Sequence, residues 1–111
     1  MEIDLHVDEQ SGWHVVSVAG EIDITTAPQL RDQLAELIEA GHDRIVVDLN
    51  QVGFLDSTAL GVMVGAHKRL RDRGHGLALA CTQPSILRVL DVTGLSSVFA
   101  MHDTVDAAVG R

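Results

Sequence analysis

Aromatic residues are scarce in this sequence. Its 111 residues include one tryptophan, two phenylalanines and no tyrosine. Proteins that hold single-stranded nucleic acid stack its bases on aromatic side chains, so a surface of that kind is not available here. Val, Leu, Ile and Ala must fill the core instead. With 46% hydrophobic residues, the chain has the composition and length of one compact domain, which we expect to span residues 1–111.

Basic residues are also few. Eight Lys and Arg face sixteen Asp and Glu, which gives a formal net charge of -8. This charge opposes binding to phosphate backbones and to anionic lipid, so we expect neither nucleic acid nor a membrane as a partner. No run approaches the ~18 apolar residues of a membrane span, and the acidic, alternating start is unlike a secretory leader. These features predict a soluble, cytoplasmic protein.

Cysteine and proline are rare, and they indicate neither a disulfide nor a domain boundary. The single cysteine, Cys81, lies in an apolar run and has no partner for an internal disulfide, which fits a reducing compartment and a buried structural thiol. Both prolines, Pro28 and Pro84, fall at predicted helix starts, so neither marks a domain boundary. The histidines lack metal-ligand spacing, and no metal or cofactor is expected. They are His6, His14, His42, His67, His75 and His102.

The first part of the chain predicts a hairpin and then a helix. Apolar residues alternate over residues 3–20, with a turn near Gly12. Apolar residues then recur at helical spacing until Gly41, and Thr26 with Gln29 has the pattern of a capping box. We therefore expect an opening β-hairpin followed by an amphipathic helix.

The remainder alternates strands with helices. The uninterrupted run Ile45–Leu49 is typical of a central strand covered on both faces. The later elements are expected as a helix from Ser57 to about Arg73, a strand at Leu77–Cys81, a helix from Thr82 through Leu90, a strand at Ser97–Ala100 and a short helix from Asp103. The fold class is α/β: a mixed β-sheet of four to five strands with an opening hairpin and about four helices packed on it.

The junction between the central strand and the second helix is the most informative segment. It has the sequence Phe54–Gly61, and Asp56 and Ser57 fall where a helix begins and backbone N–H groups lack partners. Serine and aspartate in this place are most often simple N-caps. A phosphate on Ser57 would instead face those N–H groups and the positive end of the helix dipole. The segment is thus either a plain cap or a phosphorylation switch that leaves the fold intact.

Glycines mark one face of the second helix. At 100° per residue, Gly61 and Gly65 lie opposite the apolar side that meets the sheet, with Val62 at their flank. Each glycine costs about 1 kcal/mol of helix stability relative to alanine. One interpretation is a low strip where the backbone of a partner docks beside Ser57. The other is a helical phase shifted by one residue, so that the glycines pack against a loop.

Two further acids belong to the predicted switch. Glu21 and Asp23 close the hairpin at what we expect to be the same edge of the sheet as Asp56. A phosphoserine there would sharpen an already negative potential. A partner fitted to the neutral hydroxyl would then be repelled.

These motifs resemble those of the anti-sigma factor antagonists, small bacterial proteins of the STAS family. The resemblance covers nearly the whole chain and rests on Gly20–Asp23, Ile45–Leu49, Phe54–Val62, Pro84–Leu90 and Thr93–Leu95. It implies that Ser57, directly after the aspartate, is phosphorylated by an anti-sigma factor with serine kinase activity, and that Thr58 is a neighbour of the acceptor. Ala59 departs from the family's usual glycine, which could change kinase choice.

The resemblance also implies a partner-switching mechanism. The unphosphorylated antagonist binds the anti-sigma factor and frees a sigma factor for transcription, in systems that include stress responses, and a PP2C-type phosphatase restores the active form. Asp56, Thr58 and Asp23 would support the switch. Gly61, Gly65, Val62 and Glu21 would contact the partner. An alternative within the same fold is a scaffold, or a non-switching paralogue, in a larger signalling assembly.

Other classes receive less support. A hydrolase elbow needs glycines where Leu55 and Ala59 stand, and no histidine is marked as a base, so we do not expect an enzyme. Neither a P-loop nor a dinucleotide-binding fingerprint occurs. A receiver-type phosphoacceptor at Asp48 or Asp56 disagrees with the opening hairpin and with the lack of an acidic pair after the first strand.

Overall fold

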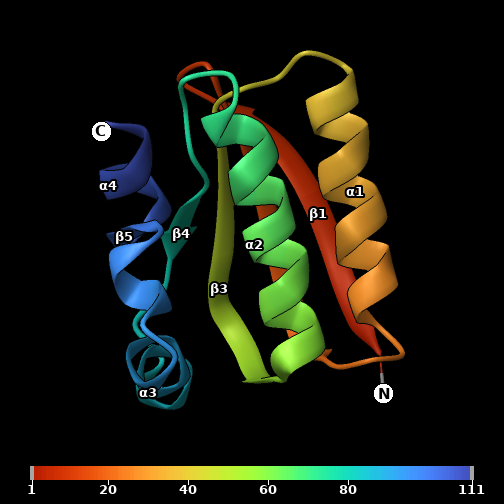
Figure 1. Cartoon of the computed structure of the whole chain (residues 1–111), viewed down its shortest axis with the longest axis vertical. Coiled ribbons are helices and arrows are strands. Elements are labelled where there is room, and N and C mark those ends of the chain that lie inside the picture. The colour runs from red at the N-terminus through yellow and green to blue at the C-terminus, as the bar shows by residue number, and fades with distance from the viewer. Residues whose placement is uncertain (1, 111) are drawn as a thin grey trace.

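A single five-stranded sheet organises the protein (Figure 1). The structure is a computed structural model that describes residues 2–110. β1 (Ile3–Gln10) pairs antiparallel with β2 (Trp13–Ile22). β3 (Ile45–Leu55), β4 (Ala78–Ala80) and β5 (Ala100–His102) continue the sheet in parallel, in the order β1-β2-β3-β4-β5. The predicted mixed sheet with an opening hairpin is confirmed.

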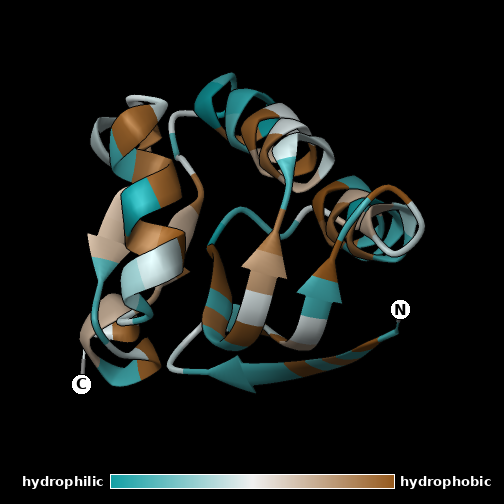
Figure 2. Cartoon of the chain, turned by 90° about the horizontal axis from the view of Figure 1, so that it is seen from below, coloured by the Kyte–Doolittle hydropathy of each residue, from teal (hydrophilic) through white to brown (hydrophobic). Residues whose placement is uncertain are grey.

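Helices cover both faces of this sheet. They are α1 (Ala27–Glu39), α2 (Ser57–Arg71), α3 (Pro84–Val92) and α4 (Val105–Val109), with a 3₁₀ turn at Leu95–Ser97. Figure 2 looks nearly along α1 and α2 and shows both end-on above the same face. The helices follow the strands in the order expected for parallel crossovers.

The apolar residues form two unequal cores. Ile45, Val47 and Leu49 of β3 belong to the large core, to which α1, α2 and α3 contribute. Val46 points to the other face and packs with Val109 of α4. Because successive strand residues face opposite sides, β3 must be apolar at both, which explains its unbroken hydrophobic run.

The predicted capping box is wrong. The Thr26 side chain makes no cap bond to the helix; its hydroxyl donates to the Glu21 carbonyl oxygen at 2.8 Å and accepts from the Asp23 N–H at 2.9 Å. Thr26 is only 1% exposed, so water cannot satisfy this hydroxyl and the end of β2 must. The residue therefore fastens the β2–α1 turn, and Gln29 points to solvent.

The predicted strand at Ser97–Ala100 is misplaced. Residues Leu95–Ser97 form the 3₁₀ turn, and β5 begins at Ala100. Gly94 adopts a left-handed conformation with φ of 75°, which redirects the chain after α3. Phe99 is buried in the large core. This residue is therefore hydrophobic because it packs in the core just before β5, and not because it belongs to the strand. β3 also extends beyond the predicted Leu49, to Leu55.

Gly20 should be the glycine on which stability depends most. Its φ is 112°, and a Cβ added there would lie 2.5 Å from the Glu2 carbonyl oxygen. We predict that Gly20→Ala lowers the free energy of unfolding by about 1–3 kcal/mol in chemical denaturation. Gly53→Ala is the matched control, since a Cβ there meets open space. Equal stability of the two variants would contradict the prediction.

Candidate functional site

Asp56 fixes the junction between β3 and α2. Its N–H donates to the Ile22 carbonyl oxygen at 3.1 Å, which ties the junction to the end of β2. Its Oδ1 accepts from the N–H of Thr58 at 2.9 Å and of Ala59 at 3.1 Å. With an extended backbone, φ -112° and ψ -173°, Asp56 has the geometry of an N-cap. The cap is therefore Asp56, and Ser57 is the first residue of the helix.

Ser57 presents a free hydroxyl. The residue is exposed, and its Oγ forms no hydrogen bond with any residue from 2 to 110. Capping by Asp56 leaves this oxygen without a structural task, so the plain-cap interpretation of Ser57 is wrong. A hydroxyl so placed is accessible to an enzyme from outside.

The predicted set of free N–H groups is reduced by the same cap. The Thr58 and Ala59 N–H groups already donate to Asp56, which leaves Ser57 with the one unbonded N–H among the first three residues of α2, as far as the described chain goes. A phosphate on Ser57 would have that N–H and the helix dipole in its favour, and the adjacent carboxylate against it. The junction tolerates phosphate but is not an empty anion site.

The end of β2 brings two more carboxylates to this edge. Glu21 pairs with Phe54 and Ile22 with Leu55, so the residues that follow β2 lie beside Asp56, as predicted. Asp23 Oδ1 accepts from the Thr25 hydroxyl at 2.6 Å, from the Thr25 N–H at 2.9 Å and from the Thr26 N–H at 3.1 Å. These bonds, led by the Thr25 hydroxyl, hold the pKa of Asp23 below its usual value against a smaller opposing effect of burial. Asp23 is therefore a fixed negative charge at neutral pH.

The sequence analysis missed two exposed apolar side chains at this edge. Ile24 is 71% exposed in the β2–α1 turn, and Phe54 is 47% exposed near the end of β3. Exposed apolar residues mark an interaction surface when they form a contiguous patch rimmed by polar residues, whereas single ones are ordinary. The sequence could have indicated that Ile24 is exposed. This residue lies between the predicted strand and the predicted helix, and neither element uses it in the core.

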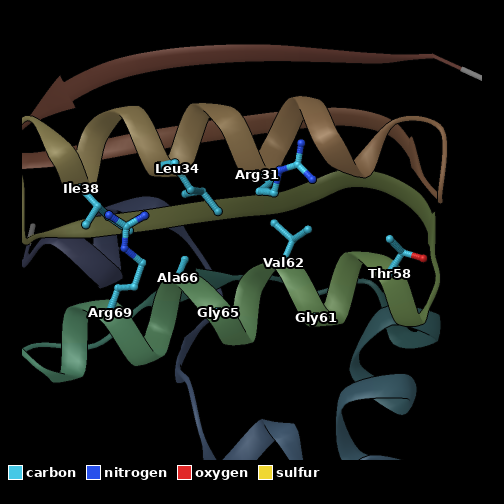
Figure 3. A pocket seen from close by; sticks show the side chains of 10 residues that line it. Arg31, Leu34, Ile38, Thr58, Gly61, Val62, Gly65, Ala66 and Arg69 are labelled. Atoms are coloured by element: carbon cyan, nitrogen blue, oxygen red, sulfur yellow. The ribbon is translucent and has the colours of Figure 1, made fainter.

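A groove runs along α2 from this edge (Figure 3). Gly61 and Gly65 are exposed, and a Cβ added to either would meet no atom within 4 Å, so the alternative in which they pack against a loop is wrong. The groove lies between α1 and α2 and has a volume of about 500 Å³. It is lined by Arg31, Leu34, Ala35, Ile38, Thr58, Gly61, Val62, Gly65, Ala66 and Arg69. The predicted contact residues Gly61, Gly65 and Val62 share this surface, and Thr58 lines its end next to Ser57.

The remaining reactive groups lie away from this surface. Burial raises the pKa of the Cys81 thiol, and the side chain is 2% exposed, as expected of a structural cysteine. Within the described part of the chain, no three His, Cys, Asp or Glu side chains gather closely enough to hold a metal ion. None of the helices in residues 2–110 is long and apolar enough to cross a bilayer.

Comparison with known proteins agrees with this architecture. Residues 4–108 match the STAS domain family. The chain belongs to that family. It is 38% identical over 98 residues to a protein named anti-sigma-B factor antagonist from Bacillus subtilis, covering 88% of this chain and 89% of the relative. It is 30% identical over 104 residues to a protein named anti-sigma F factor antagonist from Paenibacillus polymyxa, covering 93% and 89%.

The fold is also similar to that of a solved structure. The crystal structure of an anti-sigma factor antagonist from Mycobacterium paratuberculosis superimposes with a TM-score of 0.91 at 31% identity, covering 98% of this chain and 92% of that chain. The STAS fold expected from the resemblance is confirmed.

Loss of the Asp56 carboxylate should destabilise the helix start. We predict that Asp56→Ala lowers the free energy of unfolding by about 1 kcal/mol, because two N–H groups lose their acceptor. Asp56→Asn should recover most of this loss, since an amide oxygen also caps. Denaturant titration of the three proteins measures the difference. If Asn were as destabilising as Ala, charge and not capping would be the function of Asp56.

Proposed function

We propose that this protein is an anti-sigma factor antagonist switched by phosphorylation of Ser57. The unphosphorylated form binds an anti-sigma factor that has serine kinase activity, and a sigma factor is released. The names of the relatives at 38% and 30% identity support the antagonist role. A PP2C-type phosphatase would hydrolyse the phosphoserine and restore binding.

The observation that carries this proposal is the free hydroxyl of Ser57 at the first turn of α2. Its Oγ is exposed, while the neighbouring Asp56 does the capping. In the transfer, Ser57 Oγ forms a bond to the γ-phosphorus of ATP held by the partner kinase, the bond to the β,γ-bridging oxygen breaks, and ADP leaves. The hydroxyl proton passes to a base of the kinase. The antagonist supplies only the accepting oxygen.

The groove between α1 and α2 supports the position of the docking surface. Gly61 and Gly65 leave room for the backbone of a partner, Val62 lines the same surface, and Glu21 lies at the sheet edge beside the junction. Phosphate on Ser57 would add about 1.5–2 negative charges at one end of this surface. Glu21, Asp23 and Asp56 already make that end acidic, so the added charge weakens a partner fitted to the neutral hydroxyl.

Phosphate transfer should depend on Ser57 alone. Incubated with a kinase-type anti-sigma factor and ATP, the wild-type protein and Thr58→Ala should each gain one phosphate, and Ser57→Ala should gain none, as read by intact-mass and peptide mass spectrometry. Ser57→Asp should bind the anti-sigma factor more weakly than Ser57→Ala. Its melting temperature should stay near that of the wild type, because an acidic side chain is tolerated at a helix N-terminus.

Two results would overturn the switch. Phosphate that persists in Ser57→Ala at the wild-type level would place the acceptor elsewhere. Assembly into a large homomeric particle without binding to an anti-sigma factor, seen by analytical ultracentrifugation, would favour the scaffold role.

The glycine strip should matter for binding and not for folding. We predict that Gly61→Leu and Gly65→Leu each weaken the complex with the anti-sigma factor at least tenfold in calorimetry, because the new side chain fills the space open to the partner. Stability should stay constant or rise by up to about 1 kcal/mol, since leucine favours helix more than glycine does.

Lys68→Leu is the matched control for this effect. Lys68 is exposed on the same helix but does not line the groove. The Lys68→Leu substitution therefore adds a leucine to α2 outside the proposed contact surface. Unchanged affinity in both glycine variants, or an equal loss in Lys68→Leu, would remove the docking role of the strip.

A further inference from the structure

A second cavity lies at the opposite edge of the sheet from Ser57. It has a volume of about 470 Å³, within the range of small-molecule sites, which is about 300–1,000 Å³. It opens where α2 ends and the parallel strands begin. This end of α2 is at the top of Figure 1. Its lining comes from the start of β2, the α1–β3 and α2–β4 connections, the end of α2 and the approach to β5.

Part of the lining of this cavity is apolar. Trp13, the only tryptophan of the chain, is half-buried there at the first position of β2. Leu77 also lines the cavity and is fully buried, whereas Val98 is 41% exposed. A flat ring could replace water on Trp13 and Val98, and aromatic side chains gain from offset-stacked or edge-to-face contact with another ring.

Two arginines add positive charge to the same lining. Arg44 and Arg71 both line the cavity and are exposed, and neither guanidinium group forms a hydrogen bond or ion pair with a residue from 2 to 110. The one lining carboxylate, Asp43, is already engaged, because Arg73 Nη1 lies 3.0 Å from its Oδ1 and His75 Nε2 lies 3.9 Å from its Oδ2. In a chain of net charge -8, two unpaired arginines in one cavity favour an anion.

His67 also lines this cavity. Its Nδ1 accepts from the Leu77 N–H at 3.0 Å, so the proton of the neutral ring lies on Nε2, which bonds to none of the described residues. Burial, and then the charge of Arg71, lower the pKa of His67, so the ring is neutral at pH 7. A Cβ at Gly76 would lie 3.0 Å from His67 Cε1, and glycine there gives the ring the space it occupies.

We propose that this cavity binds a small anion that carries a ring, such as an aromatic carboxylate or phosphate monoester. The ring would lie against Trp13 and Val98. The anionic group would accept from Arg44 and Arg71, whose guanidinium groups match carboxylate and phosphate geometry. This site is independent of Ser57 and of the groove between α1 and α2, with which it shares no lining residue.

Phenyl phosphate is a suitable probe. In ¹H–¹⁵N NMR titrations of the full chain, it should shift the Trp13 indole, Gly76 and Leu77 signals saturably. Inorganic phosphate and phenol, which each supply half of the ligand, should bind at least tenfold more weakly. Trp13 fluorescence gives a second readout, because no other tryptophan contributes.

Charge-removing variants make the test specific. Arg44→Gln and Arg71→Gln should each weaken phenyl phosphate about tenfold, the effect of losing one charge-assisted hydrogen bond. Arg88→Gln on α3, outside the cavity, is the matched control and should bind like the wild type, as should Ser57→Ala. Thermal melts check that each variant is folded.

Several results would overturn the proposal. They are the absence of saturable shifts at these three signals, wild-type affinity for phenyl phosphate in both arginine variants, and an affinity of the wild-type protein for inorganic phosphate equal to its affinity for phenyl phosphate. Binding of an acidic peptide but not of phenyl phosphate would also refute it and assign the arginines to a protein contact. Failure here would leave the Ser57 switch intact, since neither arginine lies at that junction.

Discussion

The carboxylate of Asp56 is the interaction on which the proposed switch depends. It bonds two N–H groups of α2, while its own N–H bonds the end of β2. One residue thereby joins two strands and a helix, and it fixes Ser57 as the first helical position. If Ser57 were the cap, its hydroxyl would be occupied and its phosphorylation would break the helix start. Because Asp56 caps instead, the hydroxyl can be modified without loss of a structural bond.

The same arrangement explains how a small charge could have a large effect on binding. Asp23 is held ionised by the hydroxyl and N–H groups of Thr25 and Thr26, and Asp56 lies next to Ser57 in the chain. A phosphate added there would join several negative charges on one surface and would repel any acidic group of a partner bound beside it. The charge lowers the free energy of unfolding little, since the helix dipole favours an anion at this end of α2. The electrostatic cost therefore falls on the complex.

The sequence predicted those features that depend on local periodicity. The run at Ile45–Leu49 identified a strand buried on both faces, and the helical projection placed Gly61 and Gly65 in solvent. Periodicity did not predict the features that depend on a hydrogen bond between two different elements. The Thr26 hydroxyl bonds the end of β2, which a capping pattern of four residues cannot contain. Likewise, the groove exists only because α1 lies beside α2, and the cavity near Trp13 combines residues from five segments.

The charges of α2 connect the two ends of the molecule. Acidic groups gather where this helix begins, and Lys68, Arg69 and Arg71 lie in its last turn. Both groupings complement the helix dipole, so the distribution stabilises α2 before any ligand binds. One edge of the sheet is thus negative and the other locally positive for the same physical reason. A phosphoserine at the first edge would strengthen this polarity and an anion at the second would reduce it, so the two proposed sites would have opposite electrostatic effects on the same helix.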